Sequence, residues 1–293
     1  MDPDIYKKNI LILGASGLIG TRLRQQLKVA NHSVHTASIR LTHRDPKQLD
    51  NLRSQIRHRN IGVIINCAAM LGMKQCRLSP DIADIVNAWL PGELAKLAEA
   101  EGVQFFHVSS EAVFQSHPDG GTYAVSDEPM PETVYGKTKR LGEINVLKTG
   151  AHSVIRLPRV FDHERQIIPA LFNQLAEKGY VKVANDVFST PVFSDYAAHG
   201  ILSVVQKCLD GGAASKKILH IGGNERVSLF QLMIMLAEEA QLSKIAPVES
   251  AFFENNKEEK PFLHGGLTPC FGYGFDLKTA IDKFKLYRQM ARQ

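Results

Sequence analysis

The chain has 293 residues, 44% of them hydrophobic, which is enough to bury a sizeable core in roughly two domains. The net charge of +5 is small, and no cluster of Lys and Arg with interleaved aromatics indicates nucleic-acid binding. The sequence also lacks an apolar run of about 18 residues, a signal-peptide pattern and a CxxC pair, so we expect a cytoplasmic protein without membrane spans, disulfides or a zinc ribbon.

The first predicted strand, Asn9–Leu13, leads into a glycine-rich turn that opens a predicted helix over Leu18–Ala30. Glycines there let the backbone approach a phosphate, which the N–H groups at the helix N-terminus bind. The spacing is GxxGxxG rather than GxGxxG, and a purely structural turn is the alternative. We predict that this turn binds a dinucleotide pyrophosphate through Gly14, Ser16, Gly17, Leu18, Ile19 and Gly20.

The second predicted strand, Ser33–Ser38, is followed by Arg40, and the first acidic residue comes only at Asp45. An Asp or Glu at this point binds the ribose 2′-hydroxyl of NAD, whereas an Arg accommodates the 2′-phosphate of NADP. Arg40 therefore favours NADPH, with NADH possible, and a solvent-exposed arginine is the alternative interpretation.

Two further strands, Gly62–Asn66 and Val103–Ser109, alternate with helices predicted over 46–58 and 80–101. Ligands of parallel sheets bind at the carboxyl ends of the strands, where Ser110 follows the second of these two. Asn87, on the helix that starts at Pro80, is either a contact near the reacting groups or a polar contact within its helix.

The helix predicted over Val134–Leu147 carries Tyr135 and Lys139 four residues apart, on one face. Reduction of a carbonyl needs a proton donor at the oxygen, and a tyrosine can donate if a nearby ammonium lowers its pKa from about 10. Ser110 can hydrogen-bond the same oxygen. We predict that Ser110, Tyr135 and Lys139 are catalytic; an exposed helical pair is the alternative for the last two.

Beyond the strand predicted over Ser153–Leu157 the pattern is looser. Arg156 and Arg159 flank the end of this strand and can bind a substrate diphosphate, although an ion pair within the fold is an equal alternative for Arg156. The eleven histidines show no metal-ligand spacing, so we predict no metal site. The remaining predicted elements are helices over 166–178, 195–209 and 228–241, a strand over 217–221, and loops over 249–273.

Apolar strands that alternate with helices predict a doubly wound (Rossmann) α/β fold, a parallel sheet with helices on both faces. We expect a dinucleotide-binding domain over 1–160, to which 186–222 returns. A smaller C-terminal α/β lobe over 161–185 and 223–293 would bind the substrate.

These motifs resemble the extended short-chain dehydrogenase/reductase family, and most closely its nucleotide-sugar 4-ketoreductases of the dTDP-4-dehydrorhamnose reductase type. The resemblance implies that Tyr135 is the acid/base, that Lys139 also holds the nicotinamide ribose and that Ser110 orients the carbonyl. It further implies that the cofactor is lined by Cys67, Ala68 and Ala69. The residues expected to contact substrate are Asn87, Glu111, Arg156 and Arg159.

The leading hypothesis is therefore NADPH-dependent reduction of a keto group on a nucleotide-activated sugar. Dehydration is excluded because Ser110-Glu111-Ala112 lacks the Thr-Asp-Glu set of the family's dehydratases. Two alternatives stay open: a non-catalytic NADP-binding regulatory subunit, similar to the methionine adenosyltransferase beta subunit, and an NAD-dependent epimerase. The expected partners are the small-molecule substrate and, in a homodimer, a second copy of the chain.

Overall fold

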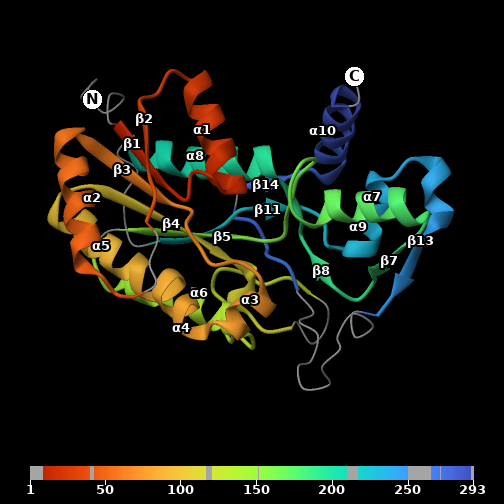
Figure 1. Cartoon of the computed structure of the whole chain (residues 1–293), viewed down its shortest axis with the longest axis horizontal. Helices are drawn as coiled ribbons and strands as arrows, with labels where there is room; N and C mark the ends of the chain where they lie inside the picture. Colours follow the sequence, from red (N-terminus) through yellow and green to blue (C-terminus); the bar gives the residue numbers. More distant parts are fainter. Residues whose placement is uncertain are drawn as a thin grey trace. The chain divides into compact units, whose positions relative to one another are not determined.

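The computed structural model, drawn in Figure 1, describes residues 9–39, 43–116, 121–150, 152–209, 217–249, 265–270 and 272–291. The chain divides into two units. Unit 1 consists of Met1–Val113, Pro129–Arg156 and Ala198–Leu219, and unit 2 of Phe114–Glu128, Leu157–Ala197 and His220–Gln293. The expected division of labour, with a dinucleotide-binding domain over 1–160 and a substrate lobe after it, stays a prediction.

A six-stranded sheet with the order β10-β5-β4-β3-β1-β2 forms the centre of unit 1 (Figure 1). β1 pairs in parallel with β2 and β3, and β3 pairs in parallel with β4. Continuous apolar runs such as Ile10–Leu13 are buried, as expected for strands covered on both faces. The predicted doubly wound α/β fold is confirmed. The strands are β1 (Asn9–Leu13), β2 (Val34–Ala37), β3 (Ile61–Asn66), β4 (Gln104–Ser110), β5 (Ser153–Leu157) and β10 (Lys217–His220).

Helices cover this sheet on both sides. On one side, Leu52 of α2, Leu94 of α5 and Val146 of α6 share an apolar cluster with sheet residues such as Ile64. Figure 1 shows α1 and α8 on the other side. The helices are α1 (Leu18–Val29), α2 (Pro46–His58), α3 (Met73–Leu78), α4 (Pro80–Asp84), α5 (Leu90–Ala100), α6 (Val134–Leu147) and α8 (Ser194–Leu209), of which α8 enters unit 1 at Ala198.

The helix predicted over 80–101 is interrupted. A π-helical turn, Ile85–Trp89, separates α4 from α5. Inside this turn the Asn87 side chain bonds the backbone of Met70 on both its N–H and C=O, at 2.8 and 3.0 Å, and Thr138 of α6 at 3.2 Å. These bonds lie within unit 1 and account for the departure from α-helix, since π-turns reposition single side chains.

Unit 2 has its own core, to which Phe172 of α7, Leu232 of α9 and Phe284 of α10 contribute. Ser228 caps α9 through a capping box with Gln231. The helix predicted over 228–241 ends at Leu236, and a second capping box starts at Glu238. None of the helices within the described residues is long and apolar enough to cross a membrane. The elements are β6 (Val160–Phe161), α7 (Ile167–Lys178), β7 (Val181–Ala184), β8 (Phe188–Ser189), β9 (Val192–Phe193), β11 (Gly222–Gly223), β12 (Val227–Ser228), α9 (Leu229–Leu236), β13 (Ile245–Val248), β14 (Gly274–Phe275) and α10 (Leu277–Met290).

A buried ion pair joins β5 to α6 in unit 1. The Arg156 guanidinium donates to both carboxylate oxygens of Glu143, at 2.9 and 2.8 Å, and neither side chain is exposed. Arg140, one turn earlier on α6, donates to the same carboxylate at 3.2 Å. The pair fixes the helix that carries Tyr135 and Lys139 to the sheet.

We predict that Glu143→Gln lowers the free energy of unfolding by about 3–5 kcal/mol, because it leaves the Arg156 charge buried without its counter-charge. The matched control is Glu93→Gln, which breaks a surface pair with Lys96 and should change stability by no more than about 0.5 kcal/mol. Denaturant unfolding measures both. Equal losses in the two variants would contradict a structural role for the buried pair.

Candidate active site

The glycine turn folds tightly against the chain that follows β3. Gly14 has a φ of +75°, and a Cβ placed there would lie 2.6 Å from the Ala68 nitrogen, so only glycine fits. The Gly17 N–H donates to the Gly14 carbonyl at 3.0 Å, and Gly17 caps α1 without a side-chain hydrogen bond. Ser16 and Gly17 are exposed at the tip of the turn. The two residues that lead into α1 are therefore exposed to solvent.

The predicted cofactor residues lie on the glycine turn with the start of α1, and on the segment after β3 that packs against this turn. Leu18 and Gly20 are buried in the first turn of α1, and Ile19 is half-buried. On the facing segment, the Cys67 N–H donates to the Leu13 carbonyl at 3.0 Å. Cys67, Ala68 and Ala69 are all half-buried. The turn and this segment thus form one surface, whereas Arg40 lies outside the described residues.

Ser110 and Tyr135 meet at the end of β4. The Ser110 hydroxyl lies near enough to Tyr135 to act on the pKa of the phenol, and it accepts the Ala112 N–H at 3.2 Å. A Cβ on Gly136 would lie 2.0 Å from the Ala112 carbonyl oxygen, so glycine lets the start of α6 pack directly on the short 3₁₀ turn Glu111–Val113. Two residues that are distant in sequence are brought into direct contact.

The expected lowering of the Tyr135 pKa is not found. Burial raises the pKa of Tyr135 to about 12; the nearby Ser110 hydroxyl opposes this rise, and Cys76 and Glu111 add to it. The Lys139 amine, which we expected to stabilise the phenolate, donates instead to the Val108 carbonyl at 2.8 Å. In this arrangement Tyr135 therefore holds its proton more firmly than a free phenol.

Lys139 is almost completely enclosed, with 1% of its surface exposed. Its Nζ lies 2.8 Å from the Val108 carbonyl oxygen and 3.2 Å from His107 Nε2. Burial lowers the pKa of Lys139 to about 8, while Glu143 and Cys67 oppose the shift. The amine titrates far closer to neutrality than an ordinary lysine.

The residues expected to contact substrate have different surroundings. The Asn87 amide is engaged with Met70 and Thr138, and the Arg156 guanidinium with Glu143, which is the ion-pair alternative considered for it. Substrate contact would require breaking these buried bonds. Glu111 is buried in the 3₁₀ turn and acts electrostatically on Tyr135. Arg159 belongs to unit 2, where its N–H donates to Ser189 Oγ at 3.1 Å.

A further residue of the site, not predicted from the sequence, is His107, which is fully buried beside Lys139 on β4. The sequence pattern could have indicated this residue. A histidine within the apolar run Phe105-Phe106-His107-Val108 faces the core of the sheet and needs a polar partner there. Among the described residues, no group of three or more His, Cys, Asp or Glu is placed to hold a metal ion.

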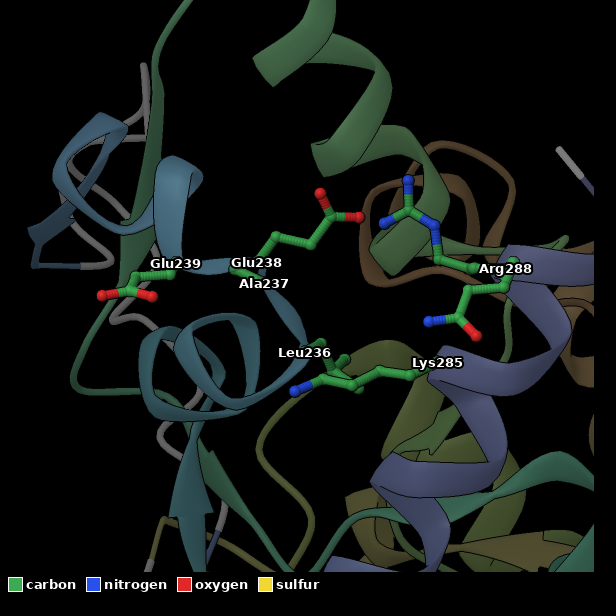
Figure 2. A pocket seen from close by; sticks show the side chains of 7 residues that line it. Leu236, Ala237, Glu238, Glu239, Lys285 and Arg288 are labelled. Carbon is green, nitrogen blue, oxygen red and sulfur yellow. The ribbon is translucent and has the colours of Figure 1, made fainter.

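Unit 2 contains a hollow of its own, shown in Figure 2. Lys285 and Arg288 project into it from α10, and Glu238 and Glu239 follow the end of α9. None of the predicted site residues lines this hollow.

Comparison with known proteins places these features in a family context. The family model of the RmlD substrate binding domain matches residues 8–261. Spore coat polysaccharide biosynthesis protein SpsK of Bacillus subtilis is 27% identical over 280 residues, covering 94% of this chain and 90% of that protein. A dTDP-4-dehydrorhamnose reductase of Mycolicibacterium smegmatis is 30% identical over 221 residues, covering 74% of this chain and 64% of that protein.

A solved structure and a further relative complete the comparison. The crystal structure of dTDP-4-dehydrorhamnose reductase from Bacillus anthracis in complex with NADP has a TM-score of 0.80 at 18% identity, covering 96% of this chain and 99% of that one; at this identity it supports the fold alone. The mouse methionine adenosyltransferase 2 subunit beta is 27% identical over 263 residues, covering 84% of this chain and 76% of that protein.

The low pKa of Lys139 predicts a pH-dependent contribution to stability. Because the unfolded chain binds the proton up to pH 10.5 and the folded chain only up to about pH 8, the free energy of unfolding rises with pH between these values. Relative to Lys139→Met, the wild type should gain about 2–3 kcal/mol between about pH 7 and pH 10. Denaturant unfolding of both proteins measures this, and a difference that does not change with pH would contradict it.

Proposed function

Because the chain belongs to the RmlD substrate binding domain family, we propose that it is an NADPH-dependent reductase of a keto group on a nucleotide-activated sugar. The observation that carries the proposal is the proximity of Ser110 and Tyr135 at the carboxyl end of β4, with Lys139 on the same helix as Tyr135. The dTDP-4-dehydrorhamnose reductases among its relatives support the substrate class. We expect this activity to reside in the cytoplasm.

The glycine turn fits a dinucleotide on its geometry. A pyrophosphate needs backbone N–H groups that a side chain does not obstruct, and the turn exposes Ser16 and Gly17 at the N-terminus of α1. We assign the pyrophosphate to this turn, and the nicotinamide half to the neighbouring segment Cys67–Ala69. When bound, the reduced nicotinamide supplies a hydride to the ketone carbon.

In the proposed mechanism Ser110 donates a hydrogen bond to the ketone oxygen and orients it. Tyr135 gives its phenolic proton to the same oxygen, so the ketone becomes an alcohol. Lys139 binds the nicotinamide ribose and, when charged, stabilises the phenolate that Tyr135 leaves behind. The raised pKa of Tyr135 suits a group that must arrive protonated.

A second candidate function is a regulatory subunit that binds NADP without turning it over. The similarity to the methionine adenosyltransferase 2 subunit beta favours it. NADPH oxidation with a panel of nucleotide 4-keto sugars distinguishes the two functions. Oxidation supports the reductase, whereas inactivity with every sugar and tight copurification of a partner protein support the subunit. Sugar interconversion without net NADPH oxidation supports the epimerase alternative.

We predict that Tyr135→Phe lowers turnover about 10²–10⁴-fold, because it removes the positioned acid, and leaves the dissociation constant for NADPH unchanged. Tyr180→Phe is the matched control, since Tyr180 is 55% exposed in unit 2, and its turnover should equal that of the wild type. Steady-state kinetics and NADPH titration measure both variants. Undiminished turnover in Tyr135→Phe refutes the assigned acid.

Arg40 generates a prediction on cofactor choice. NADPH should bind more tightly than NADH. Arg40→Ala should lower the ratio of the dissociation constants for NADH and NADPH about tenfold or more, because a bidentate contact to the 2′-phosphate is lost. Arg53→Ala, which removes an arginine from the exposed face of α2, should keep the preference. Fluorescence titration with both cofactors checks this, and a preference of the wild type for NADH removes Arg40 from its role.

A further inference from the structure

A chain of hydrogen bonds runs through the core of unit 1 from the backbone of Ala68 to the Lys139 amine. The Ala68 N–H donates to Asn66 Oδ1 at 3.1 Å, and Asn66 Nδ2 lies 3.2 Å from His107 Nδ1. His107 Nε2 in turn lies 3.2 Å from Lys139 Nζ. Asn66 and His107 are fully buried, and Lys139 is 1% exposed.

The direction of these bonds follows from the backbone. An amide N–H only donates, so the carbonyl oxygen of the Asn66 side chain faces Ala68 and its NH₂ group faces His107. The NH₂ group donates, so His107 Nδ1 must accept. A neutral imidazole that accepts at Nδ1 carries its hydrogen on Nε2. His107 therefore points an N–H at Lys139.

This direction selects one form of the lysine. An ammonium has three N–H groups and no lone pair, so it cannot accept the N–H of His107. A neutral amine accepts it, donates to the Val108 carbonyl, and has a second N–H left over. If the direction of these hydrogen bonds were reversed to suit an ammonium, the Asn66 NH₂ group would face the Ala68 N–H, and two donors would oppose each other. The backbone thus opposes the reversal.

We propose that Asn66 and His107 are positioning residues that stabilise the neutral form of Lys139 relative to the ammonium by directing a hydrogen bond at its lone pair. The proposal deepens the proposed function, on which it rests for its consequence in catalysis. Lys139 then changes charge in the range where enzymes work. Protonation of Lys139 requires the hydrogen bonds to rearrange as far as Ala68, which lies in the segment assigned to the nicotinamide half of the cofactor.

The other groups around Lys139 do not override this effect. Glu143, on the same helix, favours the ammonium, but its carboxylate is shared by Arg156 and Arg140. Cys67, after β3, is a neutral thiol because burial raises its pKa to about 12. His107, on β4, is neutral because burial lowers its pKa well below 6.5.

The first test uses the wild-type protein with and without bound NADPH. Its outcome therefore does not depend on whether a variant folds. Imidazole ¹⁵N shifts should identify His107 as the Nε2–H tautomer, and ¹⁵N shifts of lysine Nζ should show that Lys139 titrates at least about one pH unit below an ordinary lysine. An Nδ1–H tautomer, or titration of Lys139 at the ordinary value, overturns the proposal.

Variants separate the effect of hydrogen-bond direction on the titration of Lys139 from the effect of an added negative charge. The carboxylate of Asn66→Asp accepts from both Ala68 and His107, so His107 becomes Nδ1–H and its Nε2 accepts from an ammonium. The titration midpoint of Lys139 should rise by about one pH unit or more, and by much less when the same change is made in a His107→Phe background, where only the added charge acts. Equal rises in the two backgrounds overturn the proposal.

Measurements of turnover test the role of Asn66 and His107 separately from the reductase assignment. In the wild type, reductase activity should fall as Lys139 loses its proton, and in Asn66→Asp this fall should move to higher pH. If the tautomer and the lysine titration are as expected but no nucleotide sugar is reduced, the reductase assignment fails and the inference stands. If sugars are reduced while Lys139 titrates normally, the inference fails alone.

Discussion

A lysine amine enclosed in the core of an α/β unit constrains everything around it. Lys139 needs acceptors for its N–H groups, which the end of β4 supplies through the Val108 carbonyl. Its helix must lie close to the end of β4. The small size of Gly136 lets the helix pack on the 3₁₀ turn that follows β4, and the Arg156–Glu143 pair ties it to β5. The low dielectric that makes an unpaired charge costly also moves the pKa of the amine toward neutrality. The candidate chemistry of the site depends on this burial.

The sequence predicted the fold of unit 1 well because its signals are local. Apolar runs such as Asn9–Leu13 specify buried parallel strands, and the glycine turn specifies the first strand-to-helix connection. The π-helical turn Ile85–Trp89 was not predictable, since it results from bonds between Asn87 and residues that are distant in sequence. The short strand pairs of unit 2, such as β8 with β12, likewise form between segments whose own patterns are weak.

The candidate site could be predicted in its residue types but not in its connections. Spacing indicated Tyr135 and Lys139, and the structure adds the contact of Tyr135 with Ser110. No pattern in the sequence tells whether Arg156 meets a ligand or a carboxylate of the fold, because both need the same guanidinium. The sign of the Tyr135 pKa shift also depends on burial and on where the lysine points, and neither can be read from a four-residue spacing.

Hydride transfer by the protein can be followed with a labelled cofactor. The protein is incubated with NADPH that carries deuterium on the transferred position of the nicotinamide, together with a nucleotide 4-keto sugar, and the product is analysed by mass spectrometry. A reductase transfers the deuterium to the carbon that bore the keto group, in step with the oxidation of the cofactor. Recovery of unlabelled sugar with the cofactor still reduced, across all the keto sugars offered, would show that the protein is not a reductase of nucleotide-activated keto sugars.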